Sequence, residues 1–402
     1  WDSYVLLLLV RMHAAVPAWS ALCNLVPSTE VVGHSLDWLT SPVSSFSNVR
    51  PTLFRERNAW CPFSARVWLA FEIKGIEYDT VRIDAGRFDG RPSELLCGAT
   101  PQVLWPDGTL QAGSVDIIRE LNDRYFEGHD LCNVPGIERD EIFRLASACE
   151  TAFPGTMLAD GTPLRFDAPR TAFEDAIDLA NELLHLHAGP FFCGASISVA
   201  DLAWAPLLER YATWIPLTHP ELYLDDEVRW PHLCRWFQAM DEIAVYTCRL
   251  KGDAASWSKV LAASPGWLVM PARGWQPRSL SSESGHLRPR APASQQSWSS
   301  YAAPRPHVAE SANVEAAAHI IRNRHALMSD AAEQLSVLSE DVEEPLRALA
   351  WVLIGAAGDV GTSLVRTAKV QDVLRYLDDR VCVPRDMGAP AAEALTRWID
   401  KE

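Results

Sequence analysis

The sequence lacks the cysteine spacings of zinc sites and of dithiol redox sites. Its 9 cysteines are an odd number, and none belongs to a C-x-x-C or C-x-x-H pair. This pattern argues against a disulfide framework and against a structural zinc site, so we expect no bound metal. Scattered single cysteines indicate a reducing compartment, in which one thiol does chemistry and the others fill the core.

Basic charge and long apolar runs are also scarce. The chain has 36 Lys and Arg residues against 52 Asp and Glu residues, which gives a net charge of −16. A nucleic-acid binder needs clustered Lys and Arg, so we expect no nucleic-acid partner. The apolar run "YVLLLLV", residues 4–10, is too short to cross a bilayer, so we expect no membrane partner.

The length of 402 residues, with 48% hydrophobic and 22% charged residues, predicts two or three domains. The first residue is Trp1 rather than Met, and residues 1–48 are interpreted as a leader or targeting remnant; a packed core element is the alternative. Residues 268–312 are rich in Ser, Pro, Arg and Gln without a period, which predicts a disordered linker. Residues 313–402 are amphipathic again and predict a helical C-terminal extension.

The residues from 49 to 130 predict an α/β domain. We expect strands at residues 52–57, 77–84, 102–105 and 109–111, and helices at residues 62–74 and 114–126. A strand–helix–strand crossover implies a parallel pair, and the hairpin that follows adds antiparallel strands. That order is the thioredoxin-like fold. Residues 137–262 show helical periodicity throughout and predict an all-α domain.

The stretch "NAWCPFSARVWLAF" holds the strongest candidate for a reactive group. Cys61 directly precedes Pro62 at the first turn of the expected helix, where unpaired N–H groups and the helix dipole stabilise an anion. We therefore expect a nucleophilic thiolate, with a buried structural cysteine as the alternative. Ser64 stands where a dithiol site would have its second cysteine, so the thiol must work through a mixed disulfide with an external thiol.

Two further elements accompany this cysteine. Thr100-Pro101 stands at the head of a strand. In thioredoxin-like domains a cis proline occupies this place, opposite the helix-start thiol; an ordinary trans proline is the alternative. Ser114 is expected to cap the next helix. Its hydroxyl and the first N–H groups of that helix would form a binding site for a carboxylate, with a plain N-cap as the alternative.

These residues together resemble the glutathione transferase superfamily, over roughly residues 51–259. The segment "WCPFSARVWLAFEIKGIEY" is similar to the cysteine classes, namely the omega, lambda and dehydroascorbate-reductase types. The segment "SISVADLAWAP" resembles the family's helix-start box, in which Ser198 and Asp201 cap reciprocally and serve folding. The tail "VLRYLDDRVCVPRDMGAPAAEALTRWI" is similar to the end of longer transferase-like proteins of cyanobacteria, algae and plants.

The resemblance implies a thioredoxin-like N-terminal domain, an all-α transferase domain and an extra helical tail. It implies glutathione as co-substrate and Cys61 as the catalytic residue. The implied glutathione-binding residues are Phe63, Ser64, Arg91, Thr100, Pro101, Gly113 and Ser114. Trp60 adjoins the cysteine and is expected to wall the pocket of the second substrate.

The leading hypothesis is a glutathione-dependent thiol transferase or reductase that acts on a mixed disulfide or on an oxidised acceptor such as dehydroascorbate. The alternatives are conjugation of glutathione to a small electrophile and a non-catalytic, transferase-like interaction module. Gly113 and Ala99 support the last alternative, because the family usually has an acidic and a basic residue there. The resemblance also implies a homodimer. The scattered single cysteines fit either cytoplasm or plastid stroma as the compartment.

Overall fold

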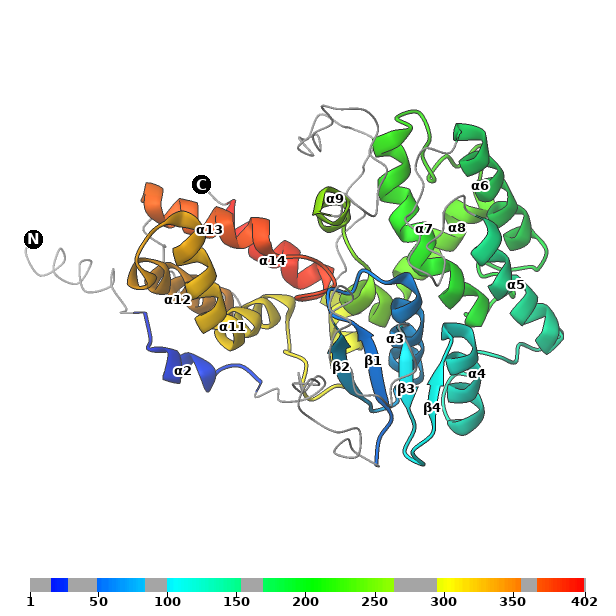
Figure 1. Ribbon diagram of the computed structural model, residues 1–402, viewed down its shortest axis with the longest axis horizontal. Helices are drawn as coiled ribbons and strands as arrows, with labels where there is room; N and C mark the ends of the chain where they lie inside the picture. Colours follow the sequence, from blue (N-terminus) through cyan, green and yellow to red (C-terminus); the bar gives the residue numbers. More distant parts are fainter. Residues whose placement is uncertain are drawn as a thin grey trace, which may run out of the picture. The chain divides into compact units, whose positions relative to one another are not determined.

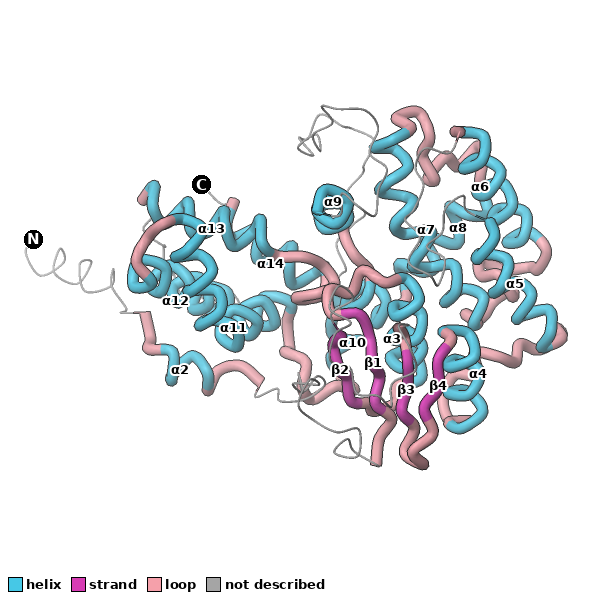
Figure 2. Tube along the Cα trace, in the orientation of Figure 1, coloured by secondary structure: helices cyan, strands magenta, loops and turns pink. Residues whose placement is uncertain are grey.

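The computed structural model describes residues 16–27, 49–83, 100–152, 169–263, 295–355 and 367–400. The chain divides into two compact units. One unit spans Glu30–Arg290, and the other combines Trp1–Thr29 with Ala291–Glu402. Figure 1 and Figure 2 show that the four strands lie in the first unit and that the described part of the second is helical.

The first unit begins with a four-stranded mixed sheet of order β2-β1-β3-β4. Its strands are β1 (Thr52–Glu56), β2 (Asp79–Ile83), β3 (Gln102–Leu104) and β4 (Leu110–Ala112). β1 pairs with β2 in parallel, while β3 is antiparallel to both β1 and β4. The crossover and hairpin expected from the sequence are therefore confirmed, and the domain has the predicted thioredoxin-like order.

Helices α3 (Pro62–Lys74) and α4 (Ser114–Arg124) pack against each other and against the sheet. The residues of α3 are buried nearly all round, because its other side lies against helix α7 of the same unit. The sequence signals at both ends hold: Cys61 is the N-cap, and Gly75 ends the helix in the left-handed region with φ 65°. Both boundaries of this helix agree with the prediction.

The start of α4 differs from the prediction. Ser114 was expected to cap this helix, but Gly113 is the N-cap and Ser114 is the first helical residue. Gly113 has φ 90° and ψ 110°, a backbone conformation that residues with a Cβ strongly avoid. The glycine thus allows the sharp turn from β4 into α4, and the side chain of Ser114 is left for another contact.

The all-α part of the first unit is confirmed. Its elements are α5 (Arg139–Ala152), α6 (Arg170–His185), α7 (Val199–Thr218), α8 (Pro231–Glu242), the π-helical turn η2 (Tyr246–Leu250) and α9 (Ala254–Ala263). The central helix α7 packs against α3, α5 and α9. Through α7, the helical domain reaches the helix that carries Cys61.

The predicted capping box at the start of α7 is confirmed. Ser198 is the N-cap, and its N–H donates to the Asp201 carboxylate at 2.8 Å. The same buried carboxylate accepts from the N–H of Phe192 at 3.1 Å and from the indole of Trp236 at 2.9 Å. Asp201 therefore links the loop before α7 to helix α8 through one buried carboxylate. Burial raises the pKa of Asp201, and the hydrogen bonds that the carboxylate accepts lower it.

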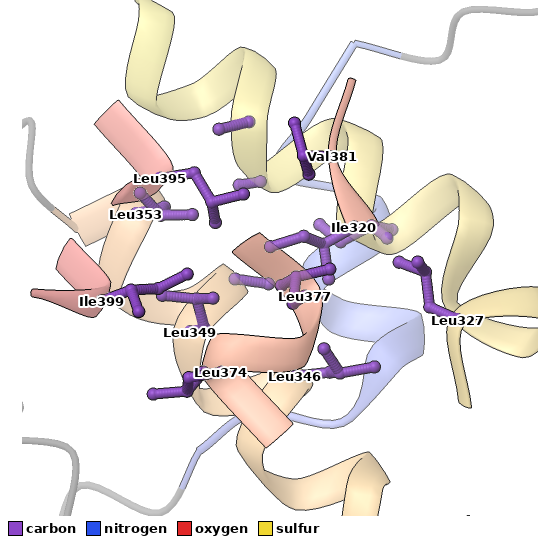
Figure 3. Packing of buried hydrophobic residues seen from close by; sticks show 14 of the residues in the cluster. Ile320, Leu327, Leu346, Leu349, Leu353, Leu374, Leu377, Val381, Leu395 and Ile399 are labelled. Atoms are coloured by element: carbon purple, nitrogen blue, oxygen red, sulfur yellow. The ribbon is translucent and has the colours of Figure 1, made fainter. Parts of the chain in front are cut away.

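The second unit is a helical cluster with its own apolar core (Figure 3). Its elements are α2 (Trp19–Cys23), α10 (Gln295–Ala302), α11 (Ala312–Leu335), α12 (Ser339–Gly355), α13 (Ala368–Arg380) and α14 (Ala389–Ile399). Leucines and isoleucines from the last four helices meet in the centre, and Asp330 of α11 accepts from Tyr376 and Arg380 of α13. The expected helical extension thus forms a folded body.

Two predicted boundaries need correction. Residues 1–48 were interpreted as a leader or targeting remnant, with a packed core element as the alternative; α2 matches the alternative, because it belongs to the second unit and Leu22 is buried in its core. Residues 268–312 were predicted to be a disordered linker, but their last part contains α10, in which the indole of Trp298 is buried and donates to the carbonyl of Ala309 at 2.9 Å. Short helices of this kind are stabilised by tertiary contacts, which a periodicity argument does not detect.

Within the described ranges, every helix is too short or too polar to cross a membrane. The apolar run at 4–10 lies outside the described residues.

Asp201→Ala should strongly destabilise the first unit, because it leaves three buried N–H groups without their acceptor. We expect a loss of about 3 kcal/mol or more in unfolding free energy, measured by thermal or urea denaturation. The exposed Asp225 offers a control, and Asp225→Ala should change stability by no more than about 0.5 kcal/mol. Equal effects of the two substitutions would contradict the structural role of the box.

Gly113→Ala should cost about 2 kcal/mol, because alanine is forced into a strained backbone conformation. The matched control is Gly75→Ala, where φ 65° and ψ 25° lie inside the left-handed region that L-residues can enter at about 1 kcal/mol. Denaturation of both variants checks the difference. A Gly113 variant that is no less stable than the Gly75 variant would show that the turn into α4 is not strained.

Candidate active site at the start of helix α3

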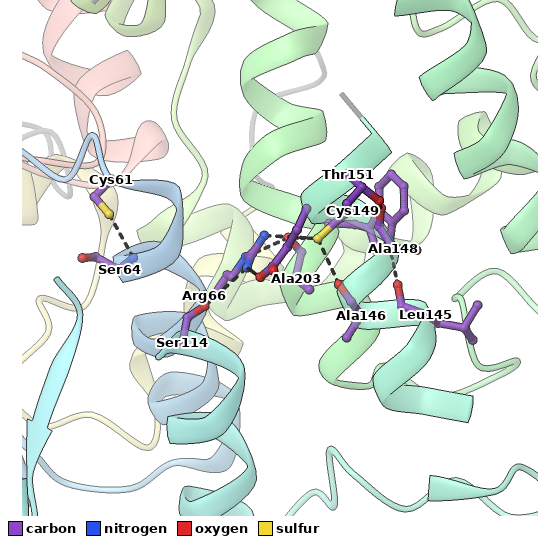
Figure 4. Close-up of polar contacts among 12 residues, drawn as sticks. Cys61, Ser64, Arg66, Ser114, Leu145, Ala146, Ala148, Cys149, Thr151 and Ala203 are labelled. Atoms are coloured by element: carbon purple, nitrogen blue, oxygen red, sulfur yellow. Dashed lines mark hydrogen bonds and ion pairs between the residues drawn. The ribbon is translucent and has the colours of Figure 1, made fainter. Parts of the chain in front are cut away.

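Cys61 lies where β1 ends and α3 begins, with its thiol at the helix N-terminus (Figure 4). Its backbone is extended, with φ −67° and ψ 116°, and its Sγ accepts the N–H of Ser64 at 3.4 Å. Cys61 is half-buried as a residue, unlike most of the described cysteines. Of the two alternatives, the geometry matches the expected helix-start thiol rather than a buried structural cysteine.

The Thr100–Pro101 peptide lies opposite this thiol. The peptide bond is cis, as expected for the head of this strand in a thioredoxin-like domain. The thiol of Cys61 lies 3.7 Å from the carbonyl oxygen of Thr100 and can donate to it. Two segments that are 39 residues apart in the chain thus meet at the sulfur.

The loop before Cys61 is organised by Glu56, a residue that the sequence analysis missed. Glu56 is only 4% exposed, and its carboxylate accepts the N–H groups of Asn58 at 2.6 Å and of Trp60 at 2.7 Å. Burial raises the pKa of Glu56, and these hydrogen bonds oppose that rise. The carboxylate thus ties the loop to the end of β1 and fixes the approach to the cysteine.

Arg210 of α7 contacts the same loop and was also missed. Its Nη2 donates to the carbonyl oxygens of Trp60 at 3.1 Å and of Ala59 at 3.5 Å. The guanidinium lies 4.1 Å from the centre of the Trp257 ring. The only sequence signal was the charged pair Glu209-Arg210 inside the otherwise apolar run "WAPLLERYATW". Periodicity cannot say which loop such a pair faces.

Ser114 lies beside a second buried arginine, Arg66 of α3 (Figure 4). Arg66 is 0% exposed, and its Nη1 donates to the Ser114 hydroxyl at 3.3 Å and to Glu150 at 3.2 Å. Its other donors reach the carbonyl of Ala203 at 3.0 Å and Cys149 at 3.1 Å. Because the Ser114 hydroxyl accepts from a cation, its own proton remains available for a carboxylate ligand.

The other predicted binding residues of the described chain lie near Cys61 or near Arg66. Phe63 is half-buried, and the Arg66 guanidinium lies 4.7 Å from its ring centre. Ser64 is buried, and its hydroxyl accepts the N–H of Glu56 at 3.5 Å, which leaves its backbone N–H as the group that faces the sulfur. Arg91 lies outside the described residues.

Trp60 is half-buried beside Cys61. Among the described residues its indole N–H has no hydrogen-bond partner. The same residues contain no cluster of three or more His, Cys, Asp or Glu side chains that could hold a metal ion. The glutathione-binding roles of these residues stay predictions. So do the expected place of Trp60 in the pocket of the second substrate and the expectation that the site holds no metal.

Two parts of the chain match models of a known protein family. The family model "Glutathione S-transferase, N-terminal domain" matches residues 60–124, and "Glutathione S-transferase, C-terminal domain" matches residues 165–239. Glutathione S-transferase L1 of Arabidopsis thaliana is 26% identical over 199 residues, which cover 46% of this chain and 77% of that protein. Glutathione S-transferase L3 of the same plant is 29% identical over 191 residues, which cover 45% of this chain and 75% of that protein.

Among solved structures, the dehydroascorbate reductase of Chlamydomonas reinhardtii is 23% identical, with a TM-score of 0.35, over 48% of this chain and 89% of that one. The two family models lie within the unit that contains Cys61 and the capping box of α7. The first unit therefore carries the N- and C-terminal domains of a glutathione S-transferase, as the resemblance in the sequence predicts.

Proposed function

We propose that the chain is a glutathione-dependent thiol transferase or reductase in which Cys61 is the nucleophile. The observation that carries the proposal is the position of its sulfur. Cys61 is a half-buried residue at the N-terminus of α3, and its Sγ atom accepts the Ser64 N–H and lies opposite the Thr100 carbonyl. A helix N-terminus supplies partial positive charge and N–H donors, and both favour a thiolate.

The other cysteines support a mechanism with one thiol. Of the eight described cysteines, only Cys23 and Cys61 are not buried. Burial raises the pKa of Cys132 to about 12 and those of Cys149 and Cys193 to about 11, so these thiols stay protonated near neutral pH. Six of the eight described cysteines are buried, so we propose that the resolving thiolate is glutathione, the co-substrate that the family uses.

The reaction proceeds in two exchange steps. The Cys61 thiolate attacks the glutathione sulfur of a mixed disulfide, forms a new S–S bond, and releases the substrate as a thiolate that takes up a proton. A second glutathione, as its thiolate, then attacks the Cys61 adduct. Glutathione disulfide leaves and the Cys61 thiolate returns, so that one disulfide is reduced for each one formed. An oxidised acceptor such as dehydroascorbate would be reduced by two glutathiones at the same sulfur.

The proposed glutathione site lies between Cys61 and the start of α4. The Ser114 hydroxyl and the first N–H groups of α4 would take the γ-glutamyl carboxylate, with Arg66 behind the hydroxyl. The backbone of Thr100 and Pro101 would pair with the cysteinyl part of the tripeptide. Trp60, with its unpartnered indole donor, would bound the space of the second substrate.

The compartment and the assembly remain proposals. None of the eight described cysteines is in a disulfide, which supports a reducing compartment such as cytoplasm or plastid stroma. We propose a homodimer by analogy with the superfamily, and sedimentation would test it.

Cys61→Ser should abolish thiol transfer, because a serine hydroxyl is neither ionised near neutral pH nor able to form a disulfide. We expect a loss of at least about a thousandfold in kcat/KM with a glutathione mixed-disulfide substrate. Cys23→Ser, at the other half-buried cysteine, should keep parental activity. If Cys61→Ser retained full transfer activity the thiol mechanism would be wrong, and aryl-halide conjugation surviving in Cys61→Ala would favour the conjugation alternative.

Ser114→Ala should raise the KM for glutathione about tenfold or more, because a hydrogen bond to a charged carboxylate is lost. Steady-state kinetics at varied glutathione measures this change. The control is Ser339→Ala, because Ser339 is likewise the first residue of a helix but is exposed in the second unit. An unchanged KM in Ser114→Ala would remove this serine from the glutathione site.

A further inference from the structure

The backbone of Trp60, the residue directly before Cys61, is held at both of its polar groups. Its N–H donates to the Glu56 carboxylate at 2.7 Å, and its carbonyl oxygen accepts from Arg210 at 3.1 Å. One anchor comes from β1 and the other from α7. The position of the cysteine at the helix N-terminus therefore depends on a residue of the all-α domain, 150 positions away from Trp60 in the sequence.

Arg210 is a buried cation, and burial disfavours its charged form. Its side chain is 3% exposed, and among the described residues its Nε has no partner. Its neighbour Glu209 is also buried, and accepts from Gly252 at 2.6 Å, Trp257 at 2.8 Å and Tyr246 at 2.9 Å. Three hydrogen bonds already partly neutralise the carboxylate of Glu209. Other negative charges nearby therefore stabilise the buried guanidinium of Arg210 further.

We propose that Arg210 is a positioning residue for Cys61, which holds the loop by its carbonyl groups and brings a buried positive charge to the peptide that leads into the cysteine. This inference rests on the proposed function, since it assigns the support of the same thiolate. In the mixed disulfide the sulfur carries no charge. The attraction to Arg210 therefore acts on the reactive form and on the leaving thiolate of the second step.

The charges that face Arg210 come from several elements. They are Glu209 on α7 itself, Glu56 on β1, Tyr246 on η2 and Cys61 before α3. Burial lowers the pKa of Arg210, and negative charge on each of these four groups opposes that change.

The test is the rate of Cys61 alkylation by iodoacetamide against pH, followed on the full-length protein by mass spectrometry of the Cys61 peptide. In Arg210→Gln the midpoint of this profile should move to higher pH by about one unit, which lowers the rate at pH 7 about tenfold. Arg210→Lys keeps the charge without the planar fork, so its midpoint should stay near that of the parent while kcat falls. Glu209→Gln should move the midpoint to lower pH.

These outcomes separate the inference from the proposed function. A parental midpoint near that of free cysteine, about 8.5, would contradict the proposed function. A low parental midpoint that stays unchanged in Arg210→Gln and Glu209→Gln would contradict only the role of Arg210. If Arg210→Gln does not fold, as judged by circular dichroism, the decision rests on the other two variants. A Glu209→Gln midpoint equal to the parent's, or an Arg210→Lys midpoint displaced by a full unit, overturns the inference.

Discussion

The active-site proposal depends on one constraint, the fixed backbone between the end of β1 and the first turn of α3. A thiol gains from the helix dipole only within the first turn, so a loop that let Cys61 move outward would lose the effect. The carboxylate of Glu56 and the guanidinium of Arg210 hold the two polar groups of the Trp60 peptide. Pro62 at the first helical position then fixes the direction in which the chain continues.

Buried charge is used for positioning throughout the first unit. Arg66 joins α3 to α5 and α7 and reaches the Ser114 hydroxyl at the start of α4. Asp201 does the same for the loop before α7 and for α8. Each group is costly to bury alone, but each meets several hydrogen-bond partners, which favours one arrangement of the helices around the thiol.

Local signals in the sequence predicted the elements that local chemistry decides. The boundaries of α3 follow from Cys61-Pro62 at one end and Gly75 at the other, and the capping box predicted the start of α7. Glu56 and Arg210 could not be found in this way, because their roles arise from contacts between elements that only the folded chain brings together. A charged residue in an apolar helix signals a buried partner but does not name it.

The errors have a related physical origin. Helices α2 and α10 have five and eight residues, too few for a period to be recognised, and they are held by the core of the second unit and by the Trp298 contact. Ser114 was one position away from its expected role because glycine, rather than a hydroxyl side chain, makes the turn into α4. Sequence reasoning thus predicted the first turns of α3 and α4 to within a residue, but not the residues that support them.

The most direct test is mass spectrometry of the protein after incubation with glutathione disulfide. We expect one glutathione adduct, on the Cys61 peptide, that is removed by added glutathione and is absent from the six buried cysteines of the described chain. An adduct confined to other cysteines, or no adduct while the fold stays intact, would contradict the claim that this sulfur is the reactive group.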